Sequence, residues 1–169
     1  MRRQYSTDGF TLIELAVVVL ILGVMIALVA PTFGEIGSAN LKRSTRRISG
    51  MIRFLRDDAL AKKAVYRLSF DIQNGRYWAE RLAVTSEQTA EFKSFQSSLA
   101  GEGGLFGQTA FRDVSVAGHP DAPYILFTPD GWVESAFIHL RDGGGRDYTL
   151  IVNPLTGRTE LVEGYVEEK

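Results

Sequence analysis

The N-terminal part of the chain contains a continuous apolar stretch. No charged residue occurs from Leu15 to Ala30, and with its flanks the apolar segment extends from Phe10 to Phe33. As an α-helix, residues 10–33 would be about 36 Å long at 1.5 Å per residue, which exceeds the roughly 30 Å of hydrocarbon in a bilayer. This length predicts a transmembrane helix over residues 10–33.

The next stretch, residues 34–63, has a narrower apolar face. Its apolar residues recur at three- and four-residue steps, which is typical of an amphipathic helix. They include Leu41, Ile48, Ile52, Leu55 and Ala59. The pattern predicts a stem helix that ends near Lys63, packs its apolar stripe against a sheet and presents Lys and Arg outward.

From residue 64 the hydrophobic period changes to two, which is typical of β-strands. Residues 64–70 and 76–82 alternate around Asn74-Gly75, a strong signal for a hairpin turn. Further short strands, separated by turn residues, are expected at residues 124–127, 132–140, 147–152 and 159–162. One long helix followed by hairpins predicts an α+β fold, with the N-terminal helix packed on a C-terminal antiparallel β-sheet.

The segment between these two groups of strands has a weaker pattern. Residues 83–123 are rich in Ser, Thr, Gly and Gln. We expect a variable surface excursion there, with a short helix around residues 86–99. Residues 64–169 as a whole are then a β-rich head domain that contains this excursion.

Charge is distributed unevenly along the chain, although the net charge is only −1. Residues 35–63 contain eight basic and three acidic residues, a net +5, whereas residues 64–169 contain nine basic and fifteen acidic residues, a net −6. The exposed basic face of the stem helix would attract phospholipid headgroups, acidic partner subunits or DNA, or would simply be solvated. The chain has no Cys, which excludes thiol catalysis and thiolate metal sites but is compatible with a periplasmic location.

Glu14 needs an explanation, because an ionised carboxylate costs on the order of a few kcal/mol toward the bilayer centre. A cleavable secretory signal would end in a small-residue cleavage site. The nearest candidate, residues 27–30, contains Leu28 and Val29. A plain membrane anchor leaves both Glu14 and the Gly9-Phe10 junction without a role. A carboxylate that needs a partner near the start of an apolar helix indicates assembly.

At these positions the sequence resembles the class III signal of type IV prepilins and type II secretion pseudopilins. The motif Gly9-Phe10-Thr11-Leu12-Ile13-Glu14 follows a short leader that contains Arg2 and Arg3. The resemblance implies that a prepilin peptidase cleaves between Gly9 and Phe10, removing residues 1–9, and N-methylates the new Phe10 amine. It further implies that the Glu14 carboxylate pairs with the N-terminal amine of a neighbouring subunit during assembly.

Pro31 and the topology are interpreted in the light of the same resemblance. Pilin helices commonly carry a proline at the position of Pro31, where a kink or local melting is expected, and a simple helix end is the alternative. Basic residues flank the apolar segment on both sides, so the positive-inside rule alone leaves the orientation undecided. The cleavage motif decides it, because the family's peptidase cuts on the cytoplasmic side.

A second resemblance concerns the C-terminal half. Residues 127–131 (Phe-Thr-Pro-Asp-Gly) and 153–158 (Asn-Pro-Leu-Thr-Gly-Arg), together with residues 55–61 (Leu-Arg-Asp-Asp-Ala-Leu-Ala), are similar to the GspH/FimT group of minor pseudopilins. The resemblance implies a structural subunit near the tip of a type II secretion pseudopilus, in the bacterial inner membrane with its head in the periplasm. The alternative is a FimT-like minor type IV pilin that acts in pilus assembly or DNA uptake. The acidic head disfavours DNA uptake, because phosphate contacts require basic residues.

The implied partners are the other pseudopilins, the prepilin peptidase, inner-membrane lipid and the secreted substrate. No cofactor, metal or enzymatic activity is expected, since no nucleophile elbow, phosphate loop or zinc-type pair occurs. His119 is expected in a loop, and His139 in a strand with a structural role. Asp142 and Asp147 bracket three glycines, which indicates either a flexible hairpin or a calcium loop of unfamiliar spacing.

Overall fold

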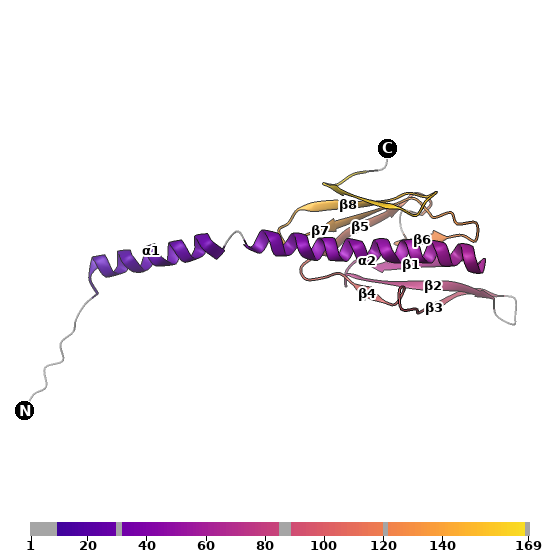
Figure 1. Cartoon of the computed structure of the whole chain (residues 1–169), viewed down its shortest axis with the longest axis horizontal. Coiled ribbons are helices and arrows are strands. Elements are labelled where there is room, and N and C mark those ends of the chain that lie inside the picture. Colours follow the sequence, from indigo (N-terminus) through magenta and orange to yellow (C-terminus); the bar gives the residue numbers. More distant parts are fainter. Residues whose placement is uncertain (1–9, 30–31, 85–88, 120–121, 168–169) are drawn as a thin grey trace, which may run out of the picture. The chain divides into compact units, whose positions relative to one another are not determined.

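The computed structural model describes residues 10–29, 32–84, 89–119 and 122–167. The chain divides into two compact units, Met1–Glu35 and Ile36–Lys169. Figure 1 shows the N-terminal helices and the sheets that follow them.

The first helix, α1, spans Leu12–Val29. The helix predicted over residues 10–33 therefore begins two residues later and ends by Val29, and a second helix begins at Thr32. Among the residues that the structure describes, no helix combines the length and the apolar character needed to cross a membrane. The predicted kink at Pro31 lies outside the described residues.

The second helix, α2, spans Thr32–Lys62. It ends where the pattern predicted, because Lys63 adopts a left-handed conformation with φ of 50° and the amide of Ala64 donates to the carbonyl of Ala59. The five apolar residues of the predicted stripe are all buried, with at most 2% exposure: Leu41, Ile48, Ile52, Leu55 and Ala59. The amphipathic stem helix is thus confirmed from residue 41 onward.

The described strands form two antiparallel sheets. The first contains β1 (Tyr66–Asp71), β2 (Arg76–Val84), β3 (Ala90–Phe95), β4 (Gly103–Gly104) and β6 (Tyr124–Phe127), in the order β3-β2-β1-β6 with β4 also paired to β2. The second contains β5 (Ala110–Val116), β7 (Ala136–Arg141), β8 (Asp147–Val152) and β9 (Thr159–Glu163), in the order β5-β7-β8-β9. The single predicted sheet is therefore split in two.

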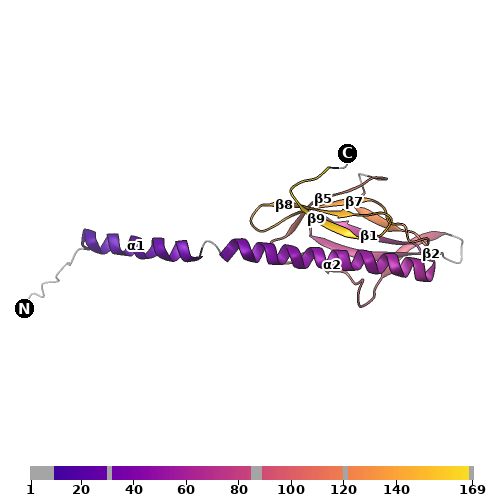
Figure 2. The ribbon, with the colours of Figure 1, turned by 45° about the horizontal axis from the view of Figure 1, so that its top comes forward.

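One hydrophobic core joins α2 to both sheets. Ile52 of α2, Leu68 of β1 and Ile138 of β7 are all fully buried members of this core. Figures 1 and 2 both show α2 running along the two sheets. The head domain and its helix are consequently one packed unit over residues 36–167.

The prediction of a short helix around residues 86–99 is wrong, since residues 90–95 form strand β3. Strand β3 pairs with β2, with Phe95 opposite Ala79 and Phe92 opposite Leu82. The Phe95 ring also packs edge-on against Tyr66, with 4.9 Å between centroids. The free edge of β2 and the aromatic contact decide the conformation, and neither is visible in the local sequence.

Candidate functional site

The start of α1 is closed by a capping box built from Thr11 and Glu14. The Glu14 amide donates to Oγ1 of Thr11 at 3.3 Å, and the Thr11 amide and hydroxyl each donate to Oε2 of Glu14 at 3.2 Å. This reciprocal arrangement satisfies two amides at the helix start. The carboxylate predicted to seek a charged partner thus already caps its own helix, through Oε2. The sequence interpretation missed this role, although Thr-x-x-Glu before an apolar run is its signature.

Phe10 precedes this cap and is 85% exposed. Gly9, the other residue of the predicted cleavage site, lies outside the described residues. Cleavage after Gly9 and methylation of Phe10 stay predictions.

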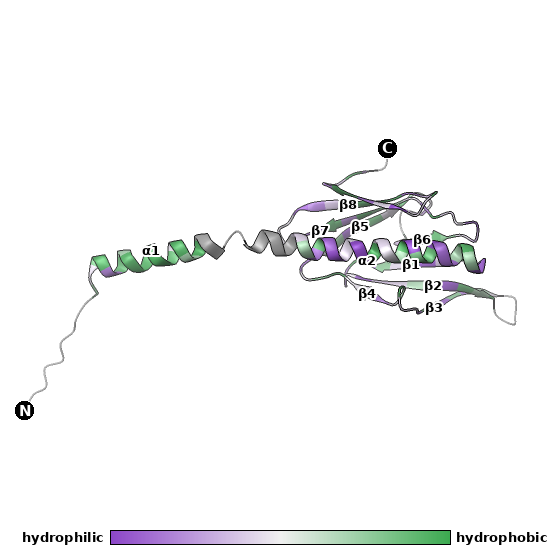
Figure 3. Ribbon diagram, in the orientation of Figure 1, coloured by the Kyte–Doolittle hydropathy of each residue, from purple (hydrophilic) through white to green (hydrophobic). Residues whose placement is uncertain are grey.

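Helix α1 exposes an apolar surface. Figure 3 shows hydrophobic residues along its described length, and twelve large apolar side chains between residues 12 and 26 have exposed fractions from 46% to 88%. They are Leu12, Ile13, Leu15, Val17, Val18, Val19, Leu20, Ile21, Leu22, Val24, Met25 and Ile26. A contiguous apolar surface of this kind marks a site that another molecule or a lipid phase covers.

The basic residues of α2 have different roles within the head unit. Arg43 and Arg47 lie over the Phe106 ring, with guanidinium carbons 4.1 and 5.9 Å from its centroid. The amide of Phe106 also donates to Oγ of Ser44 at 2.9 Å. These two arginines therefore hold the loop before β5 against the helix, although both side chains are exposed.

Arg56 joins three segments that the sequence singled out separately. Its Nε donates to the carbonyl of Gly131 at 3.1 Å, and its Nη2 lies at 3.5 Å from the carbonyl of Leu155, which accepts the bond. Gly157 packs so closely that an added Cβ would lie 2.7 Å from Cδ of Arg56. The motifs at residues 55–61, 127–131 and 153–158 thus meet at one guanidinium group. The sequence alone did not show that these three segments are in contact.

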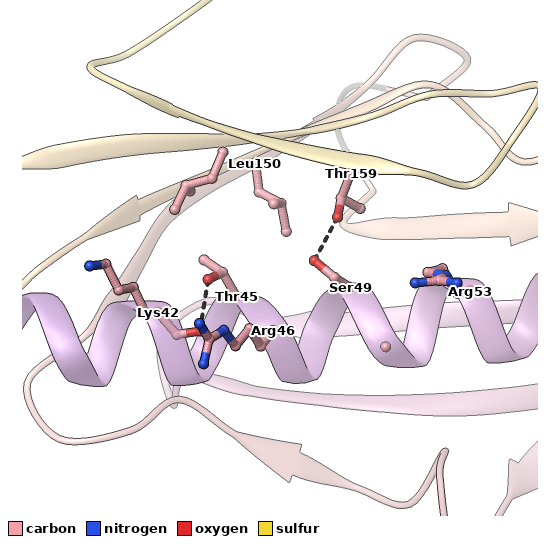
Figure 4. A pocket seen from close by; sticks show the side chains of 9 residues that line it. Lys42, Thr45, Arg46, Ser49, Arg53, Leu150 and Thr159 are labelled. Carbon is pink, nitrogen blue, oxygen red and sulfur yellow. Dashed lines mark hydrogen bonds between the residues drawn. The ribbon is translucent and has the colours of Figure 1, made fainter.

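A third set of α2 cations lines a groove between α2 and the β8–β9 edge (Figure 4). The cavity has a volume of about 480 Å³. Its lining residues are Lys42, Thr45, Arg46, Ser49, Gly50, Arg53, Leu150, Thr159 and Leu161. The Thr159 hydroxyl donates to Oγ of Ser49 at 2.6 Å, which ties β9 to the helix.

Asp58 and Tyr66 form a further contact between α2 and β1. The Tyr66 hydroxyl donates to Oδ2 of Asp58 at 2.5 Å, and Lys62 forms an ion pair with the same carboxylate. Burial and the Asp58 contact raise the pKa of Tyr66 to about 12. Burial opposes ionisation of Asp58, but the hydrogen bonds from Lys62 and Tyr66 outweigh it and lower the pKa of this carboxyl. The contact is structural, because it fixes the end of the helix on the sheet.

His119 lies in the predicted loop but is held on several sides. Its Nε2 is 2.8 Å from Oε2 of Glu134, its Nδ1 is 3.1 Å from the carbonyl of Ala122, and its ring stacks on Tyr124. Burial disfavours the imidazolium, but the Glu134 carboxylate outweighs this cost and raises the pKa of His119. Glu134 also accepts a bond from the Leu126 amide, so this network joins β6 to the segment before β7.

His139 is almost fully buried, with 2% exposure. Its Nδ1 lies 2.5 Å from Oδ1 of Asp113, its Nε2 lies 2.9 Å from the carbonyl of Val166, and Tyr165 stacks on the ring. The structural role predicted for this histidine is confirmed.

The Asp142–Asp147 loop directs its carboxylates to arginines. Asp142 accepts bonds from the amides of Gly144 and Arg146 and from the Arg146 side chain, and these bonds outweigh burial and lower its pKa. Asp147 pairs with Arg141 and Arg112, and the bond from Arg141 lowers its pKa. Within the residues that the structure describes, no three potential metal ligands cluster. The loop is an arginine-closed hairpin, and the calcium interpretation has no support from its geometry.

Comparison with known proteins finds similarity at two levels. A family model described as the prokaryotic N-terminal methylation motif matches residues 6–30. No curated protein matches the chain.

Solved structures provide the second level. Two structures of the minor pseudopilin EpsH from the type II secretion system of Vibrio cholerae are each 14% identical to this chain. One has a TM-score of 0.55 and covers 72% of this chain and 95% of EpsH; the other has a TM-score of 0.56 and covers 76% and 98%. The type IV minor pilin FimU of Pseudomonas aeruginosa is 11% identical, with a TM-score of 0.48 over 74% of this chain and 90% of FimU.

These matches confirm the predicted pilin-like α+β fold, with an N-terminal helix and a β-rich head. Together with the methylation motif, they support the resemblance to GspH/FimT-type minor pseudopilins.

Proposed function

We propose that this chain is a minor pseudopilin, a structural subunit near the tip of a type II secretion pseudopilus that supports protein export across the outer membrane. The observation that carries the proposal is the combination of a methylation motif over residues 6–30, a capped apolar helix within it, and a head with the fold of a minor pseudopilin. Each part occurs in other contexts, but their order along one chain is that of a processed filament subunit.

Residues 10–33 are proposed to hold the subunit in the inner membrane as a single pass, with the head in the periplasm. The exposed apolar side chains of α1 support this, because transfer of such a surface out of water is favourable by about 25 cal/mol per Å². The same surface would pack against neighbouring subunits after extraction into a filament. Removal of residues 1–9 would leave Phe10 as the new N-terminus.

Glu14 is proposed as the assembly carboxylate. Because its Oε2 already accepts two bonds from Thr11, the carboxylate is oriented beside the start of the helix before any partner arrives. The methylated Phe10 amine of a neighbouring subunit would add an opposite charge to this cap. Pairing two charges in an apolar environment recovers part of the cost of burying each one.

The head is proposed to make protein contacts and to carry out no catalysis. Groups that often serve in catalysis are engaged in its structure: His119 with Glu134, His139 with Asp113, and Asp142 with Arg146. The partners are the other pseudopilins and the secreted substrate, with the prepilin peptidase acting once during maturation.

Processing is tested by mass spectrometry of the N-terminus in cells that contain the prepilin peptidase. The expected mature protein begins at N-methylated Phe10, and an unprocessed chain would contradict the proposal. A Glu14→Ala variant should still be cleaved but should assemble poorly, whereas a Glu14→Gln variant would retain the cap but lack the charge. Normal assembly of Glu14→Gln would show that the negative charge has no role in docking.

The choice of machine is tested by photo-crosslinking from head and stem positions in the native host. Capture of type II secretion pseudopilins supports the tip assignment. Capture of type IV pilins or DNA instead would move the protein to a pilus and to the uptake function.

A further inference from the structure

The groove between α2 and β9 carries positive charge that the fold leaves unused. Lys42, Arg46 and Arg53 project from α2 along it and are exposed, and among the residues that the structure describes none of them lies within ion-pair distance of a carboxylate. Other cations of α2 are engaged, since Arg56 binds two carbonyls and Arg43 covers Phe106. The open row therefore differs from the rest of the basic face.

The other wall of the groove is an unpaired strand edge. β9 is the terminal strand of the order β5-β7-β8-β9, so one row of its backbone amides and carbonyls has no strand partner in the described part of the chain. Such an edge is a template for an added strand. Thr159 and Leu161 of β9 line the cavity, and Leu150 of β8 adds an apolar floor.

The two walls have the same length. Lys42 and Arg53 are eleven residues apart, which is about 16 Å along a helix at 1.5 Å per residue. β9 spans the five residues Thr159–Glu163, and five residues of extended chain also cover about 16 Å at 3.3 Å per residue. One extended segment of about five residues can therefore pair with β9 and face the three cations at once.

We propose that this groove binds an extended acidic segment of a partner protein, which adds as a strand to the free edge of β9. Acidic side chains at alternate positions would face Lys42, Arg46 and Arg53. The intervening side chains would lie on the outer face of the sheet, where the alternation of side chains along β9 also places Glu160. They would be uncharged, because Glu160 would repel a negative charge beside it. The inference deepens the proposed function and rests on it, because it expects this segment on a neighbouring subunit of the filament.

The groove favours a peptide over single-stranded nucleic acid. Proteins that bind single strands combine a positive groove with aromatic rings on which bases stack. None of the nine lining residues is aromatic. A β-strand edge instead offers alternating donors and acceptors that match a peptide backbone.

The test uses the full chain in detergent micelles and a fluorescein-labelled ten-residue peptide of alternating Glu and Thr, measured by fluorescence anisotropy. Binding should weaken about tenfold in Arg46→Glu and in Arg53→Glu, because each reversal places a negative charge opposite the peptide. Lys93→Glu is the matched control, since Lys93 is exposed on β3 in the other sheet, and it should leave affinity within about twofold. Arg46→Gln, which removes charge without reversing it, should have an intermediate effect.

Two further peptides separate strand addition from general charge attraction. A peptide with Gln in place of Glu should lose most of the affinity, and a Glu-Thr peptide with every backbone amide N-methylated should lose it as well, because neither of its edges can then donate to β9. Equal binding of the N-methylated and unmethylated peptides, or an unchanged affinity in Arg46→Glu and Arg53→Glu, would overturn the proposal. Tighter binding of a 20-nucleotide single-stranded DNA that depends on Arg46 would overturn it in favour of nucleic acid.

Failure of this inference is distinguishable from failure of the proposed function. Peptide binding is measured on the purified chain and does not depend on cleavage after Gly9 or on filament assembly. A correctly processed subunit that crosslinks to pseudopilins but does not bind the peptide would remove only the groove assignment.

Discussion

The two helices differ in whether their apolar side chains are buried within the chain. Ile21 of α1 is 53% exposed, whereas Ile52 of α2 is fully buried beneath the two sheets. Polar contacts differ in the same sense: the cap of α1 joins residues three apart, whereas Arg56 of α2 reaches carbonyls 75 and 99 positions away. The apolar side chains of the head core are buried within one chain, whereas those of α1 need another molecule or a lipid phase to cover them.

The most direct way to break this comparison is to truncate one isoleucine in each helix. Ile52→Ala should lower the free energy of unfolding of the head by about 2–5 kcal/mol, because it removes buried methyl groups and leaves a cavity. Ile21→Ala should change it by less than about 0.5 kcal/mol, since that side chain contributes nothing to the head core. Urea unfolding of the full chain in detergent, followed by tryptophan fluorescence, measures both. Similar losses in the two variants would show that α1 stabilises the head.

A smaller effect is expected at Gly157, which tests the long-range contacts of Arg56. Gly157 has φ of +61°, and an added Cβ would lie 2.7 Å from Cδ of Arg56. Gly157→Ala should therefore cost about 2–3 kcal/mol, from left-handed strain and displacement of the arginine. Gly164→Ala is the control, because Gly164 also has positive φ but no atom within 4 Å of the added Cβ, and it should cost only about 1–2 kcal/mol for the strain.

The close approach itself is isolated by a double variant. If the methyl group added by Gly157→Ala displaces the arginine, combining this change with Arg56→Ala should cost less than the sum of the single changes. Strict additivity in urea unfolding would show that backbone strain alone penalises the substitution.

Local patterns predicted much of this fold, because many elements are specified by residues close in sequence. Hydrophobic periodicity predicted the apolar stripe of α2 and the strand over residues 147–152. The Asn74-Gly75 pair predicted the turn before β2. The strand expected over residues 132–140 instead begins at Ala136. The residues before it are used otherwise, since Val133 bridges to Phe127 and Glu134 binds His119.

The rest depended on partners distant in the sequence. β3 forms because it pairs with the edge of β2 and its Phe95 packs on the Tyr66 ring, and the split into two sheets is set by which strands pair. At the candidate site, the motif at residues 9–14 was readable, but the convergence on Arg56 and the groove beside β9 were not. The sequence shows charges on one helix face; only the fold separates engaged arginines from open ones.

Changing the cap of α1 tests whether the stability of this helix is independent of the head. Thr11→Val removes the hydroxyl that accepts the Glu14 amide and should destabilise the first turn by about 1 kcal/mol, whereas Thr11→Ser keeps the bond. Amide hydrogen exchange of Glu14, measured by NMR on the mature protein in micelles, should become about fivefold faster in Thr11→Val and stay near wild type in Thr11→Ser. The unfolding free energy of the head should not change in either variant. A change there would contradict the independence of the two regions.

The smallest effect concerns a pH-dependent contact inside the head. Since Glu134 raises the pKa of His119 in the folded state above its ordinary value of 6.5, the folded state binds the proton more tightly than the unfolded state. This contribution to stability is fully present below pH 6.5 and is lost as the pH rises through the folded-state pKa. The pair is partly exposed, so the expected size is at most about 1 kcal/mol.

His119→Gln isolates the contribution, because glutamine can still donate to Glu134 but does not titrate. The difference in unfolding free energy between wild type and His119→Gln should be larger at pH 5.5 than at pH 8.5, as measured by urea unfolding at both values. His139→Gln is not a suitable control, since that side chain is buried. A difference that is the same at both pH values would show that the proton on His119 does not stabilise the fold, and that Glu134 acts only as an acceptor for the Leu126 amide.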